Sequence, residues 1–204
     1  WITPEMAVLR RDFLPEHLAP LLAANGVDGC IAVQADQSEM ETQFLLDLAR
    51  EHPFVRGVVG WVDLRSPQVS ERLAHFAADP HFRGVRHLVQ GEPNDEFLLE
   101  PDVVRGIAAL TSLGLTFDLL LVPRQLRAAT RLAAMLPDQR FVLDHLAKPL
   151  IKEGVLEPWA SDFAALAAQP NVSCKLSGLI TEADWGGWRP PDLRRYLDVA
   201  VETF

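Results

Sequence analysis

The chain has 204 residues, of which 49% are hydrophobic and 23% are charged, so it holds enough apolar material for one well-formed core. A formal net charge of −9 argues against a nucleic-acid partner, because binding nucleic acid needs a net basic surface. The sequence also has no polybasic patch of the kind that binds a membrane surface. No apolar run reaches the roughly 18 residues of a membrane span and no signal-peptide pattern is present, so we expect a cytoplasmic protein.

Helix and strand patterns alternate along the chain. In order, they predict a helix at 15–25, a strand at 29–35, a helix at 38–50, a strand at 55–63, a helix at 66–78, a strand at 84–90, a helix at 101–113, a strand at 115–121, a helix at 123–136, a strand at 140–145, a helix at 156–168, a strand at 172–179 and a final helix from about Pro191. Ser38 and Glu41 form a capping-box pattern at the start of the second helix.

The predicted strands are short, apolar and β-branched, as expected when both faces of a parallel sheet are buried. Two architectures fit this pattern, a (β/α)₈ TIM barrel and a doubly wound open sheet. No G-x-G-x-x-G turn follows a strand, which weakens the dinucleotide-binding form of the open sheet. The lone cysteines Cys30 and Cys174 lie in apolar runs and are expected to be small core residues in a reducing compartment.

Polar residues recur at or near the C-terminal ends of the six strands, about one βα unit apart. They are Gln34, Asp63, His87, Asp118, His145 and Lys175. In a TIM barrel, side chains from several strand ends meet at one mouth, whereas an open sheet spreads them along a line. The spacing therefore favours the barrel, although strand ends are also polar simply because they approach water.

Three of these residues are the strongest candidates for chemistry. His145 ends an apolar strand, and a neutral imidazole can bind a metal, accept a proton or donate a hydrogen bond. His87 and Lys175 lie within strands that should be buried, where a polar group needs a partner or a polar cavity. No G-x-S-x-G, H-E-x-x-H or paired C-x-x-C motif is present, so metal-assisted and acid–base hydrolysis both remain open.

Three segments together resemble a known family. They are "FVLDHLAKP", "FRGVRHLVQGEP" and "NVSCKLSGLITEADW", and they are similar to the branch of the amidohydrolase superfamily that contains L-fuconolactonase and related sugar lactonases. The similarity to 2-pyrone-4,6-dicarboxylate lactonase is more distant. This resemblance covers essentially the whole chain and implies a (β/α)₈ barrel that opens lactone rings with water.

The resemblance also implies where the chain lies in that barrel. His145 matches the histidine of the sixth strand, so residues 1–204 would form one barrel domain that lacks the first and eighth strands at its two ends. The His-x-His pair of the first strand would precede Trp1, and the aspartate of the eighth strand would follow Phe204. By alternation, Asp144 is expected to point away from His145 and to act as support.

Roles for individual residues follow from the resemblance. His145, Lys175 and His87 are the expected catalytic residues, with His145 as a ligand only if a metal is bound. The expected substrate-binding residues are Trp185, Gln34 and Asp118. One divalent metal, zinc, is an expected cofactor, and catalysis without a metal is the alternative. The expected partner is a small sugar lactone, and homo-oligomerisation is left open.

Two other functions remain as alternatives. The first is a metal-dependent decarboxylase of the same superfamily, in which Arg86, Arg124 and Lys175 would bind the substrate carboxylate. Against this alternative, strand alternation places Arg86 on the opposite face of its strand from His87. The second is a catalytically incomplete binding module.

Overall fold

A computed structural model describes residues 3–204. It contains six strands, each overlapping one of the segments that the sequence predicts: β1 (Cys30–Val33), β2 (Val55–Gly60), β3 (Phe82–His87), β4 (Thr116–Leu119), β5 (Phe141–Leu143) and β6 (Val172–Cys174). Only β3 extends beyond its prediction, because it begins two residues earlier than 84. Eight α-helices accompany them: α1 (Pro15–Ala24), α2 (Glu39–Glu51), α3 (Val69–Ala77), α4 (Pro101–Thr111), α5 (Leu126–Met135), α6 (Trp159–Ala167), α7 (Leu179–Glu182) and α8 (Pro190–Thr203). The predicted alternation of strands and helices is confirmed.

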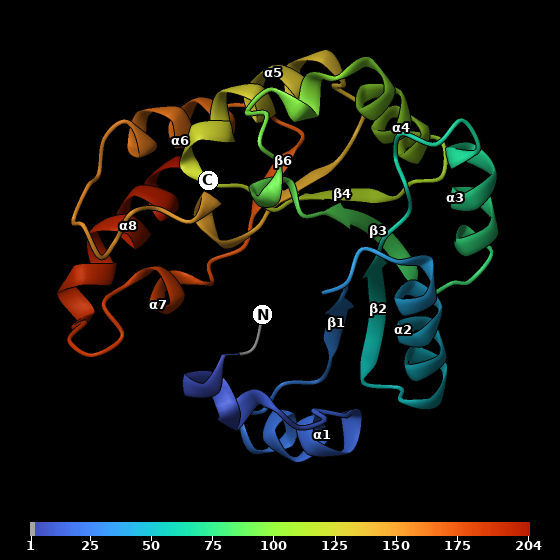
Figure 1. The fold of residues 1–204 in the computed structure, drawn as a ribbon, viewed down its shortest axis with the longest axis horizontal. Coiled ribbons are helices and arrows are strands. Elements are labelled where there is room, and N and C mark those ends of the chain that lie inside the picture. Colours follow the sequence, from blue (N-terminus) through green and yellow to red (C-terminus); the bar gives the residue numbers. More distant parts are fainter. Residues whose placement is uncertain (1–2) are drawn as a thin grey trace.

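The strands form one parallel sheet in the order β1-β2-β3-β4-β5-β6, so each strand pairs with the next one in the chain. The sheet curls into an arc with its strands inside and most of its helices outside (Figure 1). Within the described residues β1 and β6 are the two ends of the sheet and do not pair with each other. This arrangement is that of a partial (β/α) barrel, as predicted.

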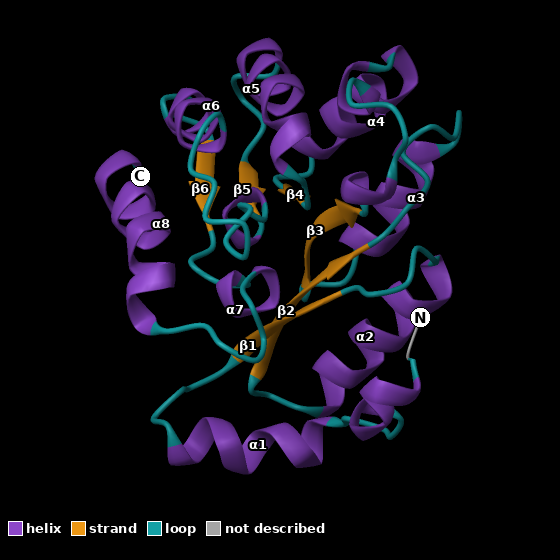
Figure 2. Ribbon diagram, turned by 60° about the vertical axis from the view of Figure 1, so that its left-hand side comes forward, coloured by secondary structure: helices purple, strands orange, loops and turns teal. Residues whose placement is uncertain are grey.

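The core lies between the outer face of the sheet and the helices that cover it (Figure 2). Val58, Val85 and Phe117 project from the strands and are fully buried, as are Leu73 and Ile107 on the covering helices. Each such side chain contributes about 1.5–3 kcal/mol when it leaves water. Helix α1 differs because none of its residues is buried, and it lies at the β1 end of the arc.

The predicted capping box at the start of α2 is half confirmed. The Ser38 hydroxyl accepts a hydrogen bond from the Glu41 backbone N–H at 3.2 Å. The Glu41 carboxylate does not complete the box, because it accepts from the backbone N–H groups of Ala35 at 3.0 Å and Asp36 at 2.6 Å. Glu41 therefore ties the loop after β1 to the helix and fixes the C-terminal end of that strand.

None of the helices formed by residues 3–204 combines the length and the apolar character that are needed to cross a membrane.

Helix α4 packs so tightly against the loop after β2 that only glycine fits at position 106. A Cβ atom on Gly106, inside α4, would lie 2.1 Å from the carbonyl oxygen of Leu64. We expect Gly106→Ala to lower the free energy of unfolding by about 1–3 kcal/mol or more, because backbone must move to relieve the overlap. Gly91→Ala is the control, since nothing lies within 4 Å of its Cβ position. Urea unfolding of both variants measures the difference, and equal stabilities would contradict the packing described.

Candidate active site

A cavity of about 520 Å³ opens on the inner, concave face of the sheet. All six strands or the turns that follow them contribute to its wall. Its lining residues are Ile31, Val33, Val59, Arg83, Arg86, Thr116, Asp118, Val142, Asp144, His145 and Lys175. The charged members Arg86, Asp118, Asp144 and Lys175 lie toward the C-terminal ends of the strands, whereas Arg83 lies near the start of β3.

Lys175 lies between two buried carboxylates. Its Nζ is 2.6 Å from Oδ2 of Asp118 and 2.6 Å from Oδ1 of Asp144. The other oxygen of Asp144 accepts a hydrogen bond from the Arg86 guanidinium at 2.9 Å. Asp118 and Asp144 are 1% and 0% exposed, so two buried anions are balanced by two cations. Removing any one member would leave an uncompensated charge, which is costly in a buried place.

Arg86 is itself held by Gln34 at the end of β1. The Gln34 side-chain oxygen accepts from Nε of Arg86 at 3.1 Å, and the Gln34 backbone carbonyl also accepts from the guanidinium. Gln34 is fully buried, so this amide is a support for Arg86. Its predicted contact with substrate stays a prediction.

Lys175 carries a positive charge. Burial by itself lowers the pKa of a lysine, but the two neighbouring carboxylates outweigh it and raise the pKa of Lys175 above its usual value. Burial raises the pKa of Asp118, and the ammonium of Lys175 opposes that change. An ammonium has three N–H donors. One donates to Asp118 at 2.6 Å, and Asp144 is an ion-pair partner of the same charge at 2.6 Å. With its side chain 34% exposed, Lys175 can present a remaining N–H to a bound molecule.

His145 follows β5 in a left-handed turn. Residues 145–148 all have φ between 53° and 55°, although none of them is glycine. This conformation costs roughly 1–2 kcal/mol for each residue and persists only when the surroundings enforce it. Leu146 is fully buried, and its carbonyl accepts a hydrogen bond from the Trp159 indole at 2.8 Å. Helix α6 therefore holds the turn that carries the histidine.

The imidazole of His145 is fixed from the loop after β6. Its Nδ1 is 2.8 Å from the Ser177 hydroxyl. Gly178 has a φ of 74° and lies so close that a Cβ there would be 2.6 Å from Cβ of His145. Burial lowers the pKa of His145 although Asp144 opposes this change, and the cations Lys148, Lys175 and Arg86 lower it further. Burial and these cations therefore favour the neutral form of the ring.

The structure corrects the expected direction of Asp144. The strand ends at Leu143, two residues earlier than predicted, and Asp144 continues its alternation with Val142 on the concave side. The left-handed turn then brings His145 to that same side. The expectation that Asp144 points away from His145 was therefore wrong, because it assumed that regular strand geometry extends through residue 145.

The structure also reverses the faces expected for Arg86 and His87. The His87 ring stacks on Phe97 with centroids 4.9 Å apart, and its Nε2 is 2.8 Å from a Glu92 carboxylate oxygen. His87 is thus outside the cavity, whereas Arg86 lines it. The register of β2 and β3 shifts between Phe82 and Gly84, and this irregularity places both Arg83 and Arg86 on the concave face.

Two further predicted residues lie away from the cavity. Asp63 is exposed, lies three residues beyond the end of β2 and accepts a hydrogen bond from the Arg65 backbone N–H at 3.0 Å, so its carboxylate orders the loop. Trp185 is 72% exposed, and its indole donates to the Thr181 carbonyl at 3.0 Å. It lines a neighbouring hollow beside α7, and its packing on a sugar ring stays a prediction.

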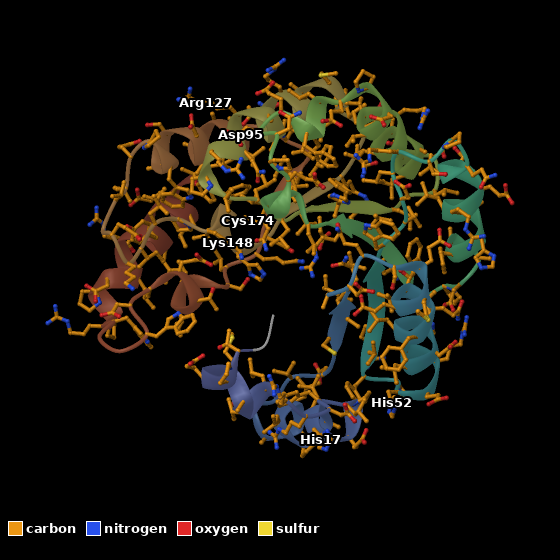
Figure 3. All side chains as sticks on the ribbon, viewed as in Figure 1. His17, His52, Asp95, Arg127, Lys148 and Cys174 are labelled. Carbon is orange, nitrogen blue, oxygen red and sulfur yellow. The ribbon has the colours of Figure 1, made fainter. Side chains whose placement is uncertain are left out.

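The described residues do not form a metal centre by themselves. Among residues 3–204 no group of three or more His, Cys, Asp or Glu side chains could hold a metal ion. His145 is one candidate ligand, but Asp118 and Asp144 are already held by cations. Burial raises the pKa of the Cys174 thiol to about 12, which keeps it protonated. Lys148 and Cys174 lie near the inner side of the arc, whereas His17 and His52 are far from them (Figure 3).

The contact between Gly178 and His145 predicts the effect of one methyl group. Gly178→Ala places a Cβ against the imidazole and also strains the backbone, so we expect a large loss of activity in the full-length protein. Gly154→Ala is a matched control, since Gly154 has a similar φ of 67° but nothing within 4 Å. In both variants the left-handed backbone at alanine lowers the free energy of unfolding by about 1–2 kcal/mol, which urea unfolding measures. Equal activities of the two variants would contradict a ring held by Gly178.

The charge cluster predicts a strong effect of Lys175 on stability. Lys175→Met leaves Asp118 and Asp144 with one cation fewer, and we expect the free energy of unfolding to fall by about 3–5 kcal/mol. The exposed Lys152 supplies the control Lys152→Met, with an expected change within about 0.5 kcal/mol. Urea unfolding at pH 7 measures both. A Lys175→Met protein as stable as the control would mean that the buried carboxylates do not need the ammonium.

Comparison with known proteins shows which family and which relatives the chain resembles. The family model described as Amidohydrolase matches residues 2–204. The L-fucono-1,5-lactonase of Burkholderia ambifaria is 43% identical over 183 residues, which cover 90% of this chain and 63% of that protein. The L-fucono-1,5-lactonase of Burkholderia multivorans is 42% identical over 214 residues, which cover 100% of this chain and 72% of that protein.

A solved structure agrees with these relatives. The crystal structure of an amidohydrolase from Burkholderia multivorans with bound zinc superposes with a TM-score of 0.94 at 41% identity, and it covers 100% of this chain and 74% of its own. The present chain spans 63% of the length of the Burkholderia ambifaria relative. On the matched residues and the shared architecture, the chain belongs to the amidohydrolase family.

Proposed function

We propose that the protein hydrolyses the ester bond of a sugar lactone. One observation carries the proposal: a neutral imidazole and a fixed ammonium, His145 and Lys175, line the same cavity at the C-terminal ends of the strands. In parallel barrels this end is where catalytic groups lie. The two L-fucono-1,5-lactonases, at 43% and 42% identity, support the substrate class.

The charges of the cavity suit ester hydrolysis. Attack of water on the lactone carbonyl places negative charge on its oxygen, and fixed donors lower the barrier most when they are already aimed at that charge. A remaining N–H of Lys175 and a ring N–H of His145 would be such donors. Because Asp118 and Asp144 hold Lys175 in place, little reorganisation is needed as the charge develops.

The remaining steps of the hydrolysis are transfer of a proton from the water and cleavage of the ring C–O bond. The attacking water loses a proton, which we assign to the eighth-strand aspartate that the family resemblance implies. The ring C–O bond then breaks, the ring oxygen takes up a proton, and a hydroxy acid leaves. The product is an anion. The two pairs of charges in the cluster cancel, and Arg83, near the start of β3, adds one more cation to the cavity wall.

Replacement of His145 tests the proposed function. We expect His145→Asn to lower kcat for sugar-lactone hydrolysis by about 100-fold or more, because the asparagine can meet Ser177 but cannot reproduce the imidazole. Proton release from the lactone is followed with a pH indicator in the full-length protein. His52→Asn, remote from the cavity, is the control (Figure 3).

The same assay separates the alternatives. Release of carbon dioxide from aromatic carboxylates, in place of proton release from lactones, would support the decarboxylase. Turnover of lactones by His145→Asn at the wild-type rate would overturn the proposed role of His145, and absence of any turnover by the wild type would favour a binding module.

A further inference from the structure

A second hollow lies at the same end of the sheet as the candidate active site. It has a volume of about 640 Å³, and its wall comes from the segments that follow β3, β4, β5 and β6 and from the starts of α5 and α6. We call it the rim pocket, and its polar lining residues are Gln90, Arg124, Arg127, Lys148, Asp162 and Glu182. Lys148 lies near the inner side of the arc and Arg127 at its outer side, so the rim pocket extends outward across the strand ends (Figure 3).

One turn joins the rim pocket to the cavity on the concave face. The His145 carbonyl accepts a hydrogen bond from the Lys148 N–H at 2.9 Å, so the turn is closed and the two Cα atoms lie within about 7 Å of each other. His145 lines the cavity, whereas Lys148 lines the rim pocket. A molecule that is held at His145 can therefore extend an attached group into the rim pocket.

The charged side chains of the rim pocket all have partners of opposite sign. The pairs are Arg127 with Asp162 at 3.0 Å, Lys148 with Glu182 at 3.8 Å, and Arg124 with Asp95. A charged ligand would have to displace a partner from one of these pairs. Hydroxyl groups can donate to the carboxylates and accept from the cations while the pairs stay intact. The rim pocket therefore suits a neutral ligand that carries both donors and acceptors.

Gln90 is the polar lining residue whose side chain has no partner among residues 3–204. Its backbone N–H donates to the Leu120 carbonyl at 2.9 Å, which fixes the residue beside the end of β4. Its side-chain amide makes no hydrogen bond with a described residue, and Oε1 is buried. A buried amide oxygen without a donor is unfavourable, and rotation about the last side-chain bond turns either the oxygen or the NH₂ group toward the pocket. A ligand hydroxyl can satisfy either group.

Apolar side chains complete the wall. They are Val122, Pro123, Leu150 and Pro158. Binding sites for small molecules commonly combine such an apolar surface with a few placed polar groups. A sugar ring matches this combination, because its C–H faces are apolar and its edge carries hydroxyls.

Building on the proposed lactone hydrolysis, we propose that the rim pocket is a subsite for a second, neutral sugar ring. The ring is either attached to the lactone through a glycosidic bond or enters as a free sugar. In both cases Gln90 forms hydrogen bonds with its hydroxyls, and the apolar residues pack on its face. The paired charges of Lys148 and Glu182 contact the hydroxyls that lie nearest to His145.

Turnover tests the attached ring. In the full-length protein, kcat/KM for L-fucono-1,5-lactone is compared with that for the same lactone bearing a galactosyl group on its 2-, 3- or 4-hydroxyl. We expect one of the three linkages to raise kcat/KM about tenfold, mainly through a lower KM, because the added contacts lie away from the reacting bond.

Two variants locate this gain. Gln90→Leu removes the amide, and Leu150→Trp narrows the pocket while leaving its polar groups in place. We expect either change to bring the ratio of the two kcat/KM values close to one. Gln169→Leu is the matched control, since Gln169 is also half-buried but lies at the opposite end of the sheet, just before β6. Because each variant is judged by a ratio of two substrates, a loss of folded protein cancels.

Nuclear magnetic resonance tests the free ring without turnover. The protein is labelled with ¹⁵N-glutamine, and the side-chain amide signal of Gln90 is assigned as the one missing in Gln90→Leu. If the ligand is a free sugar, methyl β-D-galactoside shifts this signal in a saturable way, and no attached galactosyl group raises kcat/KM.

The outcomes separate the two sources. A gain in kcat/KM that Gln90→Leu and Leu150→Trp both lose shows an attached ring, and a saturable shift without a gain shows a free sugar. The inference is overturned by the absence of both gain and shift, or by a gain that both variants keep. Failure of the proposed function would appear as a wild type that turns over none of the lactones, whereas the Gln90 signal reports on the rim pocket in either case.

Discussion

The ion pairs of Lys175 with Asp118 and Asp144 are the contacts on which the rest of the concave face depends. Lys175 follows β6, Asp118 lies on β4 and Asp144 follows β5, so a single ammonium joins three neighbouring strand ends. Arg86 on β3 joins this group through its hydrogen bond to Asp144. Gln34, at the end of β1, joins it through the hydrogen bond that it accepts from Arg86. Burial of charge is expensive, and here each charge is compensated by a partner from another strand. The geometry of the cavity therefore follows from charge balance as much as from apolar packing.

The histidine depends on a different constraint. Four consecutive residues in left-handed conformation would not persist in a free peptide, since each costs about 1–2 kcal/mol. The buried Leu146, the Trp159 indole and Gly178 enforce it from three sides. Strain of this kind gathers at functional sites, where the surroundings hold a side chain in an orientation that local preferences would not choose. Here it turns His145 toward the same face as Asp144.

Most of the fold could be predicted from the sequence, because short apolar runs, helix starts and breakers are local signals. The placement of His145 and Lys175 on one cavity also followed from their positions at strand ends. The faces of Arg86, His87 and Asp144 did not. A register irregularity between β2 and β3 and a left-handed turn of non-glycine residues interrupt the alternation that the prediction assumed. Both arise from contacts between segments distant in sequence, and no local pattern signals them. A buried charge in an apolar strand does signal a role, and Arg86 carried that signal as clearly as Lys175.

The strand order bears on how the chain folds. Every strand pairs with the strand that comes next in sequence, so each pairing closes a loop of only one βα unit. The entropic cost of closing a loop rises slowly with its length, so each of these pairings carries a similar closure cost. The sheet can therefore grow strand by strand from any adjacent pair. The charge cluster needs β3 to β6 side by side, so the chemistry of the site exists only where these four strands are paired.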